Sequence, residues 1–151
     1  MKTAHRDLAV TAAGRELLAC VKVAAPIDRV YRALASSEVT AWWVRPGVFD
    51  TREWSGDLRV GGRWRASGIG CGQPYALEGE FLEVQPPTRL VHTWTLPGAT
   101  GPASTVAYRL SPMETGTVLQ IEHSGFSSRE ACAQTAAGWE SSLEALMNTF
   151  G

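Results

Sequence analysis

Residues 127–151, SSREACAQTAAGWESSLEALMNTFG, decide the fold of this chain. Their apolar side chains recur at steps of three and four residues, which is the spacing of one face of an α-helix. That face consists of Cys132, Ala136, Trp139, Leu143, Leu146 and Phe150. At about 1.5 Å per residue the helix is roughly 33 Å long, so its apolar stripe needs a partner surface of similar length. Ser127 followed by Glu130 predicts a capping box at its start.

Most of the chain before this helix alternates between apolar and polar residues, which indicates β-strands. The alternation is clearest at residues 15–24 and 89–96. Between these segments, Pro26 begins one short helix, and Ser36 or Ser37 caps a second one. The expected order is one strand, two short helices, about five or six antiparallel strands and the long helix. The surface that covers the helix is therefore expected to be an antiparallel sheet.

One of these strands, at residues 75–84, breaks its own alternation. Glu78 and Glu80 share one face, whereas Glu83 falls on the other. A bulge near Phe81-Leu82 would return all three carboxylates to solvent, because an inserted residue inverts the pattern beyond it. We therefore expect a bulge here and a solvated face of glutamates.

Composition favours a single globular domain in a reducing compartment. The 151 residues are 44% apolar and 19% charged, with a net charge of −1. This charge gives no electrostatic basis for binding nucleic acid, and no apolar run reaches the ~18 residues of a membrane span. Three cysteines without CxxC spacing argue against a disulfide framework or zinc site, so we expect a cytoplasmic protein. Residues 1–14 are expected to form a polar N-terminal arm, and residues 15–151 one domain.

Five segments resemble the START-like superfamily, and in particular the branch similar to the C-terminal domain of the activator of the heat-shock protein 90 ATPase. They are residues 25–34 (an opening helix), Trp42-Trp43, the turn at 57–62, the hairpin at 78–94 and the closing segment at 123–143. The resemblance covers about residues 15–150. It implies the α+β helix-grip fold, in which a curved antiparallel sheet of about six strands wraps around a long C-terminal helix, with two short helices after strand one.

The resemblance also implies a cavity between sheet and helix, and inward-facing residues are the candidates to line it. These are Trp43, Trp64, Tyr75, Phe81, His92, Trp94, Tyr108, His123 and Trp139. A solid aromatic core is the alternative, and Trp139, in mid-helix, could either fill the space or line it. The spaced glycines of residues 68–72 precede a strand rather than a helix, so they predict a flexible loop at the cavity mouth and not a phosphate site.

Three functions follow from these observations and remain open. The first is non-catalytic binding of a small apolar or amphipathic molecule, such as a lipid or an aromatic metabolite. The second, implied by the resemblance, is a polyketide cyclase or aromatase in which His92, His123 or Tyr108 acts as acid or base. The third, also implied, is a chaperone-interaction module of the stress response. The sequence indicates no cofactor, and no residues at metal-ligand spacing. The resemblance allows a homodimer.

Overall fold

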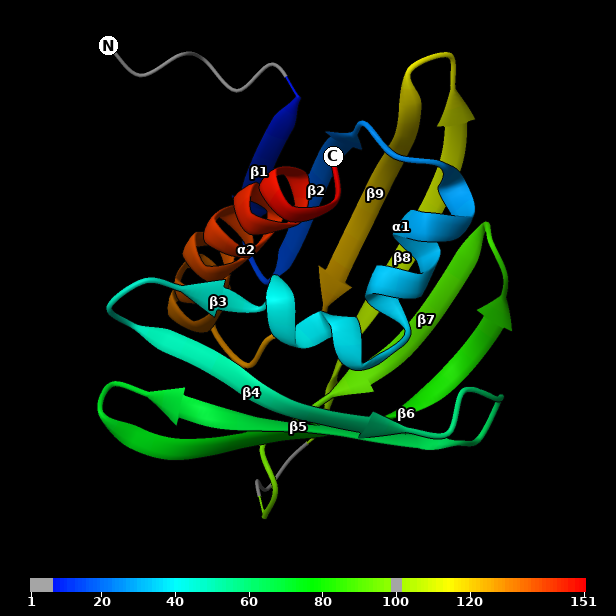
Figure 1. Cartoon of the computed structure of the whole chain (residues 1–151). Coiled ribbons are helices and arrows are strands. Elements are labelled where there is room, and N and C mark those ends of the chain that lie inside the picture. Colours follow the sequence, from blue (N-terminus) through cyan, green and yellow to red (C-terminus); the bar gives the residue numbers. More distant parts are fainter. Residues whose placement is uncertain (1–6, 99–101) are drawn as a thin grey trace, which may run out of the picture.

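The computed structural model describes residues 7–98 and 102–151 and places them in one curved sheet with two α-helices and a 3-10 helix (Figure 1). In chain order the elements are β1 Leu8–Ala13, β2 Glu16–Val23, α1 Ile27–Leu34, the 3-10 helix η1 Ser37–Ala41, β3 Val44–Arg45, β4 Phe49–Gly56, β5 Arg63–Gly70, β6 Gln73–Gln85, β7 Arg89–Trp94, β8 Ser104–Met113, β9 Gly116–Ser124 and α2 Arg129–Phe150. The sheet is antiparallel throughout, in the order β1-β2-β9-β8-β7-β6-β5-β4-β3. The predicted helix-grip class is confirmed.

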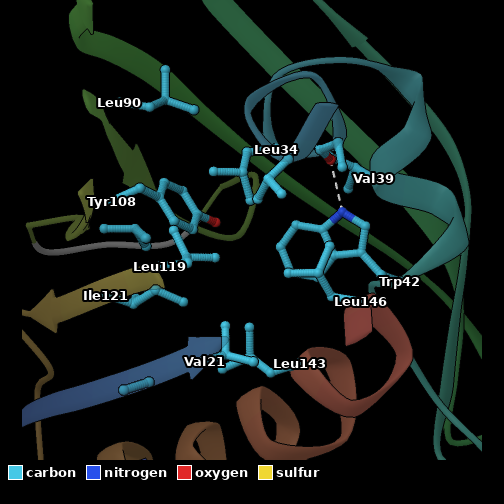
Figure 2. Close-up of a cluster of buried hydrophobic side chains, with 14 of the residues drawn as sticks. Val21, Leu34, Val39, Trp42, Leu90, Tyr108, Leu119, Ile121, Leu143 and Leu146 are labelled. Atoms are coloured by element: carbon cyan, nitrogen blue, oxygen red, sulfur yellow. Dashed lines mark hydrogen bonds between the residues drawn. The ribbon is translucent and has the colours of Figure 1, made fainter. Parts of the chain in front are cut away.

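The hydrophobic core lies between α2 and the concave face of the sheet. Alternate residues of β2, β8 and β9 are buried, as their sequence alternation predicts. Leu143 and Leu146 of α2 are fully buried in the same cluster, and burial of each contributes about 1.5–3 kcal/mol. Figure 2 shows these side chains converging with those of β2, β8 and β9. It also shows Trp42, whose indole Nε1 donates to the Ala33 carbonyl at 2.7 Å and so closes the end of α1.

The bulge expected in β6 is present. The register of β6 with β7 shifts between Phe81 and Glu83, so Leu82 is the extra residue and is exposed. Phe81 then stays in the core, while the Glu83 carboxylate turns outward and accepts a hydrogen bond from Arg89 Nε at 3.0 Å. The insertion is what keeps a carboxylate out of the core at this point in the strand.

The N-terminal boundary and the strand number differ from the sequence-based expectation. Leu8–Ala13, expected to be part of an arm, pair with β2 as an edge strand, and residues 1–6 of that arm lie outside the described residues. With β1, the two-residue β3 and the polar β4, the described residues form a sheet of nine strands instead of about six. These three segments were missed because short or Ala-rich strands carry little alternation of their own. Their pairing partners define them.

Two local predictions were also wrong. The cap of α2 is Ser128, whose Oγ accepts from the Ala131 amide at 3.1 Å. Glu130 is then the second helical residue, one position before the third, where a capping box with Ser128 needs its carboxylate. Ser127, which has the right spacing to Glu130, is not the N-cap. The expected loop at residues 68–72 is a tight hairpin: β5 continues to Gly70, and only Cys71-Gly72, both at positive φ, turn the chain.

Candidate functional site

A pocket of about 290 Å³ lies between α2 and the part of the sheet formed by β4, β5 and β6. The helix supplies Gln134, Thr135, Gly138, Trp139 and Ser142, which share one helical face, and the rest of the lining is Trp43, Phe49, Thr51, Gly70, Tyr75, Leu77 and Trp94. On the sheet the lining residues alternate along β4 and β6, because only every second side chain points to the concave face. The pocket is therefore the space left where the sheet curves away from the helix.

Three tryptophans form a continuous aromatic wall in this pocket. Trp43 stacks on Trp94 with ring centroids 5.1 Å apart and planes 29° apart. Trp94 in turn lies 5.8 Å from Trp139. Trp139 is 3% exposed and forms part of the lining, so the helix tryptophan stands at the side of the space and leaves it open. Ring contacts of this kind stabilise the wall, because offset and tilted aromatic pairs attract one another beyond their buried area.

Besides the tryptophan indoles, the polar groups of the described lining residues are hydroxyls and one amide. The Trp43 indole N–H is buried and has no hydrogen-bond partner among the described residues. The Thr51 hydroxyl and the Tyr75 hydroxyl are hydrogen-bonded to each other on the sheet wall. Burial raises the pKa of Tyr75, and the bond to Thr51 opposes this only in part, so the phenol is neutral. On the helix wall Ser142 is 5% exposed, and its hydroxyl takes part in none of the hydrogen bonds found among the described residues.

His123 lies behind the wall in a closed hydrogen-bond network. Its Nδ1 accepts from the Trp139 indole at 3.0 Å, and its Nε2 is 2.8 Å from Ser104 Oγ, which donates to the Trp94 carbonyl. Since an indole N–H can only donate, Nδ1 carries no proton, and Nε2 is the protonated nitrogen. Burial, with a smaller contribution from His92, lowers the pKa of His123 to about 3. The neutral imidazole thus connects two tryptophans: it bonds directly to the Trp139 indole and, through Ser104, to the Trp94 carbonyl.

His92 and Tyr108 are packed into the core. His92 Nδ1 lies 2.9 Å from the Thr93 carbonyl, and burial lowers the His92 pKa to about 4. Tyr108 is fully buried, and its hydroxyl has no partner among the described residues. Figure 2 shows that hydroxyl pointing between Leu34 and Leu119, and burial raises its pKa. Neither residue belongs to the pocket lining.

The nine predicted site residues thus divide into two layers. Four of them line the pocket: Trp43, Tyr75, Trp94 and Trp139. The other five, Trp64, Phe81, His92, Tyr108 and His123, lie behind it in the core. The sequence analysis missed Phe49, Thr51, Leu77 and the polar helix residues around Trp139. The helical spacing from Trp139 could have found Thr135 and Ser142, and the strand alternation from Tyr75 could have found Leu77.

The described residues contain no group of three His, Cys, Asp or Glu side chains placed to hold a metal ion. In the same part of the chain, no helix combines the length and apolarity needed to cross a membrane. All three cysteines are free thiols.

A curved antiparallel sheet closed around a long C-terminal helix, with a pocket beneath that helix, defines a helix-grip protein of the START-like class. The family described as "Activator of Hsp90 ATPase homolog 1-like protein" matches residues 24–151, and the chain belongs to this family. The START-like resemblance inferred from the motifs is therefore confirmed.

Solved structures agree with this assignment. Protein CV1439 from Chromobacterium violaceum is 27% identical, with a TM-score of 0.80 over 90% of this chain and 96% of that one. CalU16 from Micromonospora echinospora is 28% identical, with a TM-score of 0.63 over 92% of this chain and 80% of that one. An AHSA1-like protein from Aeromonas hydrophila, at 20% identity and a TM-score of 0.74 over 88% and 90%, shares the fold. None of the curated proteins matches.

Proposed function

We propose that this protein binds a small apolar or amphipathic molecule, without catalysis, in the pocket between α2 and the sheet. The observation that carries the proposal is an aromatic-walled space of about 290 Å³ with no charged side chain among the described residues that line it. Trp43, Tyr75, Trp94 and Trp139 would touch the ligand. Trp64, Phe81, His92, Tyr108 and His123 would hold that wall in place from behind.

The apolar surface that a ligand can bury in the pocket limits the strength of binding. A ligand that buried ~200 Å² of apolar surface would gain roughly 5 kcal/mol from transfer out of water, before the cost of association. That alone gives weak binding, so polar contacts must add to it. The Ser142 hydroxyl, which has no hydrogen-bond partner among the described residues, and the Thr51–Tyr75 hydroxyl pair are available on opposite walls for this purpose.

A cyclase-type reaction has less support, because its acid–base candidates are not placed to reach a ligand. His92, His123 and Tyr108 are all absent from the lining, and burial disfavours the charged form of each. A general acid or base must lie within hydrogen-bond reach of the proton that it moves. These groups therefore fit a supporting role.

The binding proposal is tested by amide and indole NMR titration of the ¹⁵N-labelled chain with a panel of fatty alcohols, lipids and aromatic metabolites. We expect at least one compound to shift the indole signals of Trp43, Trp94 and Trp139 and to spare that of Trp54. Gly138→Leu would fill the pocket and abolish the shifts, whereas Ala133→Leu, on an exposed position of the same helix, would preserve them. The proposal fails if no compound of the panel shifts the three pocket indoles.

Membership of the Hsp90-activator family carries a second candidate, contact with a chaperone. Its test is the ATPase rate of purified Hsp90 with and without the chain. A rate increase lost on mutation of exposed residues, and kept in Gly138→Leu, would place the function on the surface. An unchanged rate and no complex in a pull-down would remove this candidate.

A further inference from the structure

The helix wall of the pocket contains a glycine that helix formation does not favour. Gly138 stands in the interior of α2, where glycine destabilises a helix relative to alanine. Packing does not demand it, because a Cβ at this position would meet only the Phe49 ring, at the ordinary distances of 3.6 and 3.8 Å. The main structural effect of the missing methyl group is therefore to leave space in the pocket that Gly138 lines.

The sheet wall opposite also contains a bare position. Gly70 of β5 lines the pocket, and a Cβ there would lie 3.3 Å from Tyr75 Cδ1 and 3.8 Å from Phe49 Cβ. Phe49 thus reaches from the sheet glycine to the helix glycine and forms one edge of the pocket. Gly138 and Gly70 thus contribute bare backbone to the helix wall and to the sheet wall of the pocket, with Phe49 between them.

The chemistry of the lining selects against charge. The twelve lining residues that the structure describes include no Lys, Arg, His, Asp or Glu. An ion placed there would lose its hydration without gaining a partner of opposite charge, which is strongly unfavourable. The groups that remain for specificity are hydroxyls and the Gln134 amide, which exchange hydrogen bonds with hydroxyl or carbonyl oxygens.

The volume of the pocket limits the size of the ligand. An engineered apolar cavity of about 150 Å³ accepts one benzene ring. The pocket here, at about 290 Å³, has roughly twice that space. Flat rings also gain more than saturated ones of equal size from walls such as Trp43, Trp94 and Trp139, because stacked and edge-on aromatic pairs attract beyond their area burial.

We propose that the pocket is a slot for a flat, uncharged aromatic compound of two or three fused rings bearing a hydroxyl or carbonyl group, seated against the bare backbone of Gly138. The inference rests on the proposed binding function and narrows its ligand class. The ring would lie along the tryptophan wall, and its oxygen would meet Ser142 or the Thr51–Tyr75 pair.

The test compares matched compounds on the intact chain by isothermal titration calorimetry and by the indole NMR signals. The probes are 2-naphthol, decahydro-2-naphthol (the same skeleton and hydroxyl, but saturated and puckered), 2-naphthoate and 1-decanol. We expect 2-naphthol to bind about tenfold more tightly than the saturated alcohol. We expect 2-naphthoate to bind more weakly still. If decahydro-2-naphthol, 1-decanol or 2-naphthoate binds as tightly as 2-naphthol or more tightly, the proposed ligand class is wrong. The general binding function would then still stand. No indole shift with any probe would overturn the slot, and failure of the wider panel as well would overturn the binding function.

Addition of a single methyl group, by Gly138→Ala, tests whether the ligand lies against the backbone of Gly138. Gly138→Ala should keep the fold, raise the unfolding temperature and lower the affinity for 2-naphthol about tenfold, since the added methyl overfills a close-fitting site. Ala133→Gly, at an exposed position on α2, should lower the unfolding temperature and leave the affinity unchanged. Unchanged affinity in a folded Gly138→Ala variant would refute the role of the glycine.

Discussion

Removal of one hydroxyl group, by Tyr108→Phe, should make this protein more stable. The Tyr108 side chain is fully buried, and its hydroxyl has no hydrogen-bond partner among the described residues. An unsatisfied buried polar group costs about 1–3 kcal/mol relative to a hydrated one. Loss of the oxygen leaves only a small void, so we expect a net gain of about 1–2 kcal/mol in the free energy of unfolding. For a domain of about 150 residues this corresponds to a rise of roughly 2–8 °C in Tm.

The assay is urea unfolding at pH 7, followed by tryptophan fluorescence and circular dichroism, with the m-value compared between variants. Tyr31→Phe is the matched control. The Tyr31 hydroxyl donates to the Arg89 carbonyl at 3.1 Å, so its removal should lower stability by about 0.5–1.5 kcal/mol. If Tyr108→Phe is destabilised as much as Tyr31→Phe, the hydroxyl has a partner such as a buried water molecule, and the reasoning is refuted.

Three further predictions concern the buried histidines and the helix glycine. Burial lowers the pKa of His92 to about 4 and that of His123 to about 3, so the unfolded chain takes up both protons first as the pH falls. The free energy of unfolding should therefore fall by about 1.4 kcal/mol per pH unit for each histidine between pH ~6.5 and ~4, measured by urea unfolding across that range. Trp139→Phe leaves His123 Nδ1 without its donor, so stability should fall by about 2–4 kcal/mol and the His123 pKa should rise, as an NMR titration of the ring would report. Gly138→Ala should raise the free energy of unfolding by about 0.5–1 kcal/mol in the absence of ligand, because the new Cβ meets Phe49 only at ordinary contact distance.

Each of these has an outcome that contradicts it. A His92→Asn variant, whose amide can still donate to the Thr93 carbonyl, should lose about half of the pH slope, and an unaltered slope would show that His92 is not among the titrating groups. A Trp139→Phe variant with an unmoved His123 pKa would mean that the indole bond does not fix the tautomer. Destabilisation by Gly138→Ala would show that the helix needs close approach at this point.

The architecture could be predicted because its signals are local and periodic. The spacing from Cys132 to Phe150 defines α2, and alternation defines β2, β7, β8 and β9. Even the bulge in β6 is encoded locally, since three glutamates cannot share a solvated face without it. The elements that were missed or shortened, β1, β3 and β4, contain Ala, polar residues or only two positions. Hydrogen bonds to a neighbouring strand define them, and such pairing carries no local signature.

The position of the pocket could not be predicted from the periodicity of the sequence. Sequence alternation determined that His92, Tyr108 and Trp94 all face the inside of the sheet, and in the structure they do. It could not determine which of them meets a packed wall and which meets open space, because periodicity reports direction and not the distance to the opposite element. That distance was decided by the curvature of the sheet and by the path of α2 across it. In the resulting structure Trp139 lies at the side of the pocket and donates a hydrogen bond to His123, and Gly138 lines the open space beside it.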